Sequence, residues 1–505
     1  MRLLLRGTAT WERARSAPSK SGELLAVVRT VIAVAYGFRR CAVVTLLGRA
    51  RVVALAVVAI GMPALPASTI AASPSPAAHH VSGTQPDLSS PAAELRIALD
   101  RLLAEHAFLT IEQMRSGLAG APDFAAAAAA VEGNSVQVAA AIGSIYGEEA
   151  VEPFGEIWRS HIGYLVDFAV GMGDGDAAAQ QQALQGLADY RQRLRTFLTD
   201  ANPGVALDAI VEALDMHTAQ LVEFITAVHA GDHTTAFRIE REAYPHMFDL
   251  GDALARVIAN RFPDRYTGID VAYSSAGTLR VTLDRILGEH AFLAAGAMRS
   301  GVVGSDDFGA AAEAIAGNSD DLQAVVAAAY GDEAAGDFRE LWDAHITAYV
   351  QYIQAARAND LAARDAANAV ISDYARQLAA FLTSANPHLD AASLTTLFQD
   401  HAAHLSGQVE AFAAGDYDTT YALVRTGYEH MFTVGEALAI GIATQMPKKF
   451  PADSVAPSTD TDPHAGHGGG DWTRWLVPLV LAAGVALIVG MAALRRGALV
   501  IRRPR

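Results

Sequence analysis

The chain has 505 residues, which is enough for two or three domains that each bury a core. Its net charge of −17 is unevenly distributed, because residues 73–472 hold 22 of the 38 basic and 53 of the 55 acidic residues, a net charge of −31. Such an acidic surface excludes nucleic acid as a partner. The single cysteine, Cys41, lies in the N-terminal region, so the rest of the chain has no disulfide, thiolate ligand or cysteine nucleophile.

The N-terminal region has the pattern of an export signal. From Arg49 the sequence runs through arginines, a short apolar stretch, small residues and a Pro/Ser-rich segment. This order is typical of a secretory signal, with cleavage expected between Ala67 and Ala72. We therefore predict a leader over residues 1–72 and a disordered linker over 73–90. A retained N-terminal anchor is the alternative.

The C-terminal region has the pattern of a membrane anchor. The segment from Trp475 to Leu494 carries no charge, and its length matches that needed to cross a bilayer core. Trp472 and Trp475 stand on one side and a group of arginines on the other, which indicates a cytoplasmic C-terminus. We predict a flexible stalk over 449–472, a transmembrane helix over 473–494 and a cytoplasmic tail over 495–505. The protein would then be a single-pass cell-membrane protein with most of its chain outside the cell.

Between these ends the sequence contains two copies of one pattern. The segment Leu95–Arg261 aligns with Leu279–Gln445 over its whole length without a gap. Shared blocks include "EHAFL", "MRSG", "GNS", "ANP" and "HMF". We predict a first repeat over 91–264, a linker over 265–277 and a second repeat over 278–448.

Each repeat has the periodicity of packed helices. In one segment, for example, apolar residues and one histidine recur at steps of three and four, at Leu207, Ile210, Leu214, His217, Leu221 and Phe224. Gly- and Asp-rich turns separate such segments by short connections, which favours antiparallel neighbours. The predicted fold is therefore all-α, with two tandem six-helix up-and-down bundle domains and one C-terminal transmembrane helix.

Polar residues recur near the middle of these helices, and each follows the last by nearly the same interval, so they should lie at one height of the bundle. Four of the six in each repeat are histidines on the apolar side of their helix. Imidazole nitrogens bind transition metals, and helical bundles often place such ligands in their cores. We predict a metal at a four-histidine layer in each repeat, with the ligands His106, His161, His217 and His246 in the first and His290, His345, His401 and His430 in the second.

Other residues narrow the predicted chemistry. Tyr190, Asn134, Tyr374 and Asn318 are candidates to fix the histidine tautomers. Without thiolates the site suits copper or zinc, and the nearby Met114 and Met298 favour copper. A carboxylate-bridged di-iron centre is poorly supported, because Glu105 and Glu289 point away from their neighbouring histidines.

Two other interpretations of the histidines stay open. Opposed histidines across a bundle can hold haem, and a hydrogen-bonded polar layer can fix the register of a metal-free structural or interaction module. No nucleophile elbow, phosphate-binding loop, metalloprotease helix or dinucleotide fingerprint occurs, which favours binding over catalysis, and an enzyme that uses a His/Tyr metal site is a third hypothesis. The protein partner is undefined.

The repeated blocks also carry a resemblance. "EHAFL" followed by "MRSG", and "REAYPHMF" followed by "GDALA", resemble repeats in uncharacterised secreted or surface proteins of Gram-positive bacteria. The resemblance implies an extracytoplasmic helical module, and it implies no particular activity.

Overall fold

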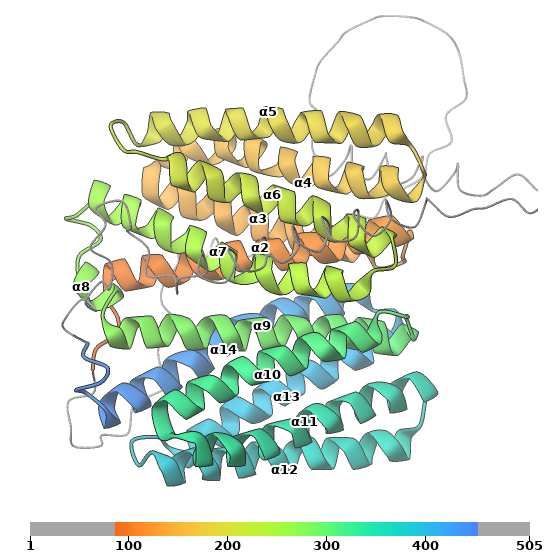
Figure 1. Cartoon of the computed structure of the whole chain (residues 1–505), viewed down its shortest axis with the longest axis vertical. Helices are drawn as coiled ribbons and strands as arrows, with labels where there is room; N and C mark the ends of the chain where they lie inside the picture. The colour runs from red at the N-terminus through yellow and green to blue at the C-terminus, as the bar shows by residue number, and fades with distance from the viewer. Residues whose placement is uncertain (1–85, 453–505) are drawn as a thin grey trace, which may run out of the picture. The chain divides into compact units, whose positions relative to one another are not determined.

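The computed structural model describes residues 86–452, whose helices are labelled in Figure 1. The first repeat contains six long α-helices and one turn of 3-10 helix. They are α2 (Pro91–Ala119), α3 (Phe124–Tyr146), η1 (Glu148–Ala150), α4 (Val151–Gly173), α5 (Ala177–Ala201), α6 (Asp208–His229) and α7 (His233–Arg261).

The second repeat has the same series of six long helices, which follow the short α8 (Ile269–Ala272). They are α9 (Ser275–Val303), α10 (Phe308–Tyr330), α11 (Asp332–Ala358), α12 (Leu361–Ala385), α13 (Ala391–Ala414) and α14 (Tyr417–Gln445). Four pairs of helices (α2 and α9, α3 and α10, α5 and α12, α7 and α14) begin and end at positions that align between the repeats. No strand occurs within residues 86–452, so the all-α prediction is confirmed for this part of the chain.

The same local signals set the first helix of each repeat. Ser90 precedes α2 and its hydroxyl accepts a hydrogen bond from the Ala93 amide at 3.1 Å, while Ser274 does the same for the Gly277 amide before α9 at 2.9 Å. Both helices end at a glycine in the left-handed conformation. These caps hold α2 and α9, and the histidines that they carry, at equal positions along their repeats.

The two repeats pack directly on each other through α2, α7, α9 and α14, which lie together in the middle of Figure 1. The rings of Phe108 and Phe292 stack with centroids 3.9 Å apart, and the Tyr244 hydroxyl donates to the Tyr428 hydroxyl at 3.3 Å. Both are pairs of equivalent residues, as in the contact of a two-fold symmetric dimer. The described residues accordingly belong to one unit rather than to two separated bundles.

Each repeat also supplies a cation for a buried carboxylate of the other. Arg425 donates to Glu105 at 2.8 Å, and the equivalent Arg241 donates to Glu289 at 3.2 Å. Both glutamates are almost fully buried, and a buried charge is costly unless it is paired. Glu105 and Glu289, each next to a mid-helix histidine, therefore bind an arginine of the other repeat.

The segment predicted as a linker, residues 265–277, contains α8 and the first turn of α9, and it packs on α2. The Thr267 carbonyl accepts from the Ala92 amide at 3.1 Å, and Arg96 donates to the Ala272 carbonyl at 2.7 Å. At the start of the predicted stalk, Phe450 packs on the core of the second repeat. The described ends of the repeats are thus held by contacts with helices.

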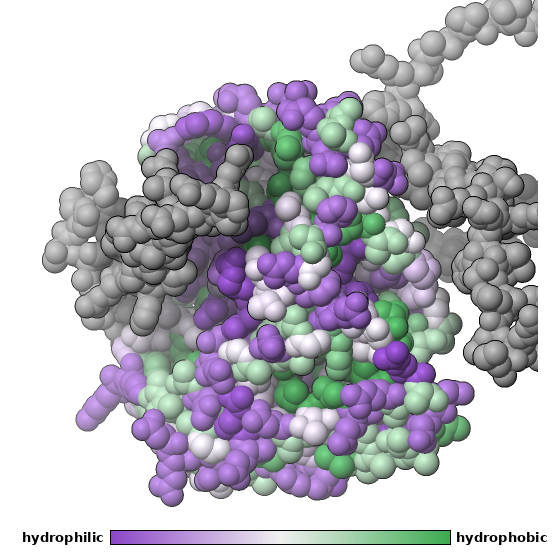
Figure 2. Space-filling model, turned by 45° about the vertical axis from the view of Figure 1, so that its right-hand side comes forward, coloured by the Kyte–Doolittle hydropathy of each residue, from purple (hydrophilic) through white to green (hydrophobic). Residues whose placement is uncertain are grey.

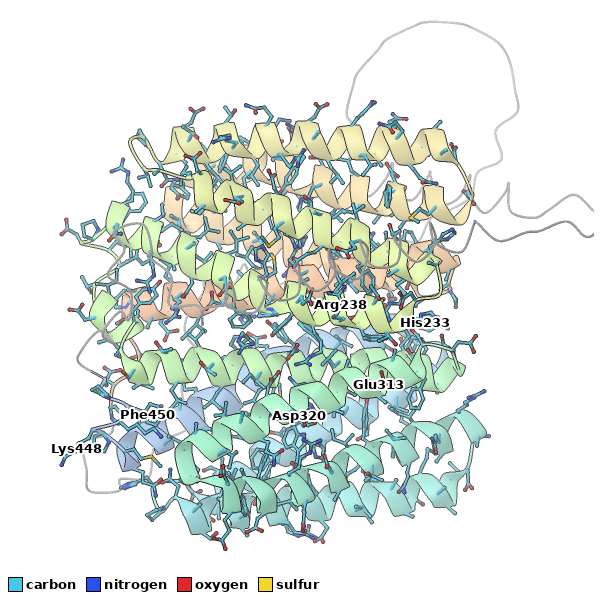
Figure 3. All side chains as sticks on the ribbon, viewed as in Figure 1. His233, Arg238, Glu313, Asp320, Lys448 and Phe450 are labelled. Carbon is cyan, nitrogen blue, oxygen red and sulfur yellow. The ribbon has the colours of Figure 1, made fainter. Side chains whose placement is uncertain are left out.

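Charged and hydrophobic side chains alternate on the described surface. Figure 2 shows hydrophilic side chains interspersed with hydrophobic ones over one face. Exposed charged residues such as Arg238 on α7 and Glu313 and Asp320 on α10 are labelled in Figure 3. A mixed surface of this kind is ordinary for a protein in water.

Within residues 86–452, α3 is the one helix long and apolar enough to cross a membrane, and 44% of its most apolar stretch is buried inside the protein. It packs against α2 and α4, as an alanine-rich core helix does. The predicted leader, transmembrane helix and cytoplasmic tail lie outside the described residues, as do residues 73–85 of the N-terminal linker and 453–472 of the stalk.

Candidate metal centre

Three histidines of the first repeat meet in its core. His106 lies on α2, His161 on α4 and His217 on α6, and these three helices contact one another. All three side chains are buried, and one ring nitrogen of each lies within 4.8 Å of the others. His106 Nε2 and His161 Nε2 are 3.0 Å apart. Within the described residues, this is the one group of three or more candidate ligands at such distances.

The surroundings keep these three rings neutral. Burial lowers the pKa of His106 well below its usual value, and the neighbouring His161 and His217 lower it further. Burial lowers the pKa of His161 to about 3, against a small opposing effect of the Trp158 backbone. The pKa of His217 is lowered in the same way, by burial and then by His161 and His246. Protons therefore do not compete for the ring nitrogens at neutral pH, which leaves lone pairs for a metal.

Hydrogen bonds satisfy few of these nitrogens. One Nε2 of the His106 and His161 pair can donate to the other, whereas both ring nitrogens of His217 and the Nδ1 atom of His106 are buried with no hydrogen-bond partner among the described residues. A buried polar group without a partner costs about 1–3 kcal/mol. The site is thus rich in ring nitrogens that no hydrogen bond satisfies.

Aromatic rings enclose the cluster. Trp158 packs against His106 and His161 with ring centroids 4.5 and 4.8 Å apart, and Tyr190 stacks on His161 at 4.5 Å. Tyr190 was predicted beside the histidines and lies there, with its ring rather than a hydrogen bond in contact with His161. These rings hold the imidazoles in place and exclude water.

The fourth predicted ligand of the first repeat, His246 on α7, stands apart from the group of three. Its side chain is half-buried, and its Nε2 donates to the Ala213 carbonyl on α6 at 2.8 Å. Its effect on the pKa of His217 shows that it lies near that ring. The α6 carbonyl, rather than the other histidines, therefore holds Nε2 of His246.

Asn134 and Met114 were predicted at the site, and their contacts are elsewhere. The Asn134 amide donates to the Leu102 carbonyl at 2.9 Å and to Glu105 at 2.8 Å, so it orients the carboxylate and not a histidine. Met114 lies in a separate apolar cluster. It follows His106 by eight residues on α2, about 12 Å along the helix axis, which is too far for a shared ion.

The second repeat arranges the equivalent residues in a related but looser way. His290 lies 5.7 Å from His345 and 5.6 Å from His401 between ring centroids, compared with 5.0 and 5.6 Å for the equivalent rings of the first repeat. Tyr374 stacks on His345 at 4.3 Å. His430 donates to the Leu397 carbonyl at 2.8 Å, as His246 does to Ala213.

The other predicted site residues of the second repeat follow their counterparts. Asn318 donates to the Ile286 carbonyl at 3.0 Å and to Glu289 at 2.8 Å. Met298 is buried in an apolar cluster with Ala294, Tyr352 and Ile353. Asn318 therefore orients Glu289, and Met298 packs among apolar side chains, as Asn134 and Met114 do in the first repeat.

A cavity of about 100 Å³ lies between the six long helices of the second repeat, and sequence reasoning did not find it. An empty apolar cavity of that size costs on the order of 2 kcal/mol. The sequence contained one indication of this cavity: the small residue Ala329 aligns with the larger Ile145 of the first repeat. The cavity is lined by apolar side chains together with His345, His401, Tyr330, Tyr349, Tyr374 and Trp342.

Comparison of the chain with protein-family models, with curated proteins and with solved structures found no match. The fold and the site define a helical protein with a buried cluster of three histidines that can hold a metal ion.

Proposed function

We propose that the first repeat binds one transition-metal ion, copper or zinc, through His106, His161 and His217. The carrying observation is that three buried, neutral imidazoles from three helices bring ring nitrogens within 4.8 Å of one another. Two ligands at about 2.05 Å in a tetrahedral site stand about 3.3 Å apart. His106 and His161 are already close to that separation at 3.0 Å, so binding requires mainly a small approach of His217.

The ligand set selects the metal class. Three imidazoles and no thiolate suit zinc and copper. Met114 no longer favours copper, because it lies in a different apolar cluster. A fourth coordination position is left for water or for the free Nδ1 of His246 after a change of its ring position. Such a site serves metal binding, storage or relay.

Haem is the less favoured ligand for this cluster. Two axial nitrogens on one iron would stand about 4 Å apart with the macrocycle between them. His106 Nε2 and His161 Nε2 are closer than that, at 3.0 Å, and Trp158 and Tyr190 fill the space beside them. A metal-free structural layer remains the main competitor, and the metal content of the protein distinguishes the two.

Metal content of the full chain tests the proposal. We expect about one tightly held copper or zinc ion per chain after loading and extensive dialysis, measured by elemental mass spectrometry. His161→Ala removes this ion, and the matched variant His345→Ala in the second repeat retains it. A chain that holds no metal under these conditions, or loses it equally in both variants, contradicts the proposal. Circular dichroism of both variants confirms that they are folded.

For the second repeat we propose weaker metal binding by His290, His345 and His401, because the rings of His290 and His345 lie 5.7 Å apart, against 5.0 Å for His106 and His161. At high metal concentration we expect the number of bound ions per chain to rise from one toward two. His345→Ala should lose this second ion. His246 and His430 would join only through Nδ1 after a change of ring position, because Nε2 of each ring contacts a carbonyl. A carbonyl-bound ring can still bind metal through its other nitrogen.

We also propose that the protein is exported and anchored in the cell membrane by residues 473–494, with its repeats outside. The basis is the sequence pattern at both ends and the acidic charge between them. Protease treatment of intact cells should then digest the repeats and leave a small C-terminal fragment in the membrane fraction. Full protection of the repeats in intact cells contradicts this orientation.

A further inference from the structure

The cavity of the second repeat has the shape of a site for an elongated molecule. Its lining on α11 extends from Ala334 to Tyr349, fifteen residues or about 22 Å along the axis. The lining on α12 extends from Ile371 to Ala385 in the opposite direction. The space of about 100 Å³ has room for roughly eight water-sized groups. It therefore runs from one end of the bundle to the level of the histidines.

Polar groups gather at one end of this cavity. Tyr349 and Tyr374 have buried hydroxyls with no hydrogen-bond partner among the described residues, and the same holds for both ring nitrogens of His401. His345 stacks on Tyr374. All four residues line the cavity. The opposite end, near Ala334, Ala385 and Leu389, is apolar except for Tyr330, whose hydroxyl already accepts a hydrogen bond from Asn386.

The lining also defines the charge of a suitable ligand. No Lys, Arg, Asp or Glu of the described residues lines the cavity. A carboxylate or an ammonium group would be buried there without a counter-charge, which is costly. A hydroxyl or a carbonyl group, by contrast, can bond with the tyrosine hydroxyls and the imidazole nitrogens.

Comparison with the first repeat shows where the lining of this space differs in side-chain volume and polarity. Ala329 replaces the buried Ile145, and Val434 replaces Leu250, so the second repeat has lost side-chain volume at both positions. Tyr349 replaces Leu165, which adds a hydroxyl group that has no partner. Other lining positions gain volume, such as Phe398 in place of Leu214, so the lining is rearranged rather than simply emptied. A buried hydroxyl without a partner in the lining of a cavity is costly unless a ligand bonds with it.

We propose that the second repeat binds a neutral, elongated apolar molecule with one hydroxyl or carbonyl head group. The chain of this ligand lies along α11 and α12 toward Ala385. Its head group bonds with Tyr349, Tyr374 and the nearby histidines. This binding uses different residues from metal binding in the first repeat. It shares His345 and His401 with the weaker metal site proposed for the second repeat, so it is measured on the metal-free chain.

Quenching of tryptophan fluorescence tests this assignment, because Trp342 lines the cavity. The full chain, held in lipid nanodiscs, is titrated with ω-bromodecanol, whose bromine quenches a nearby indole. We expect a saturable component of the quenching, above the background from Trp472 and Trp475 at the predicted membrane anchor, that is lost in Trp342→Phe and kept in Trp158→Phe, the equivalent change in the first repeat. The double variant Ala329→Ile, Val434→Leu restores first-repeat residues and should weaken binding at least about tenfold. Ala329→Val is the milder variant if the double one does not fold.

Matched ligands separate the claims about shape, head group and charge. Tyr349→Phe should weaken ω-bromodecanol binding by about threefold to tenfold and leave bromodecane unaffected. Equal affinity for bromodecane and ω-bromodecanol contradicts recognition of the head group. Equal or tighter binding of ω-bromodecanoate contradicts the requirement for a neutral ligand. Unchanged affinity in every cavity-filling variant that folds overturns the site itself.

Discussion

The two repeats place their histidines on equivalent helices and surround them differently. In the first repeat the rings of His106 and His161 lie 5.0 Å apart and are enclosed by packed side chains, whereas His290 and His345 lie 5.7 Å apart and His345 borders a cavity. The helix bounds of the two repeats correspond almost throughout. The difference teaches that a few side chains, rather than the course of the backbone, decide whether this frame suits an ion or a larger ligand.

Metal removal should separate the repeats most strongly. Metal present at a thousand times its dissociation constant adds about 4 kcal/mol to the free energy of unfolding. We therefore expect a chelator to lower the unfolding free energy of the loaded wild-type chain by several kcal/mol, and to have no effect on His106→Ala. Urea unfolding with and without chelator measures this. An equal chelator effect in His106→Ala would place the stabilising ion elsewhere.

Exchange of core volume should have opposite effects in the two repeats. Ile145→Ala removes packed atoms from the first repeat and should cost about 2–4 kcal/mol of unfolding free energy, because it leaves a cavity. Ala329→Ile fills existing space in the second repeat and should cost less than about 1 kcal/mol or stabilise. Chemical denaturation of the metal-free chain compares them. If Ala329→Ile is as costly as Ile145→Ala, this space is not available to a larger side chain.

The ion pairs between the repeats should behave alike. Arg425→Met leaves Glu105 buried without its cation, and Arg241→Met does the same for Glu289. We expect each variant to lose about 2 kcal/mol of stability, below the full cost of breaking a buried pair because both arginines are partly exposed. Thermal unfolding of the two variants measures this. A large difference between them would show that the contact is not symmetric.

Acid should destabilise the metal-free chain through its buried histidines. Burial lowers the pKa of His345 to about 3, against about 6.5 in the unfolded chain. The unfolded state therefore binds more protons below pH 6.5, so this contribution to stability is present above that pH and is lost as the pH falls toward 3. We expect a loss of up to about 2 kcal/mol from this residue at about pH 5.

The variant His345→Gln isolates that contribution. Its unfolding free energy should fall less between about pH 7 and pH 5 than that of the wild type. The buried Glu240, with a pKa raised to about 7 by burial, acts in the opposite direction, and it is present in both proteins and cancels. An identical pH dependence in the two proteins would show that His345 is protonated in the folded state.

Periodicity predicted the helices and the inward side of most histidines, because both depend on residues close in sequence. It did not predict the contacts of His246 and Asn134. Both lie on the expected side of their helices, but a carbonyl on α6 holds the first and Glu105 holds the second. Helical spacing gives the direction of a side chain and not which of several nearby groups it bonds with.

The contact between the repeats and the cavity required the structure for another reason. Residues 102–116 of α2 are buried without interruption, which its "EHAFL" sequence suggests only in part. The partner that buries the second side of α2 is the other repeat, which is far away in the sequence. The cavity depends on the summed volume of side chains from six helices, and single differences such as Ala329 acquire meaning only when those helices are placed.

X-ray absorption spectroscopy of the full chain loaded with one equivalent of zinc tests the central claim most directly. We predict a first shell of light atoms at about 2.0 Å together with the outer-shell pattern of three imidazoles. The double variant His161→Ala, His345→Ala, at the same metal content, should lose this pattern, while His345→Ala alone keeps it. A wild-type spectrum with oxygen ligands and no imidazole pattern would contradict a metal site at His106, His161 and His217.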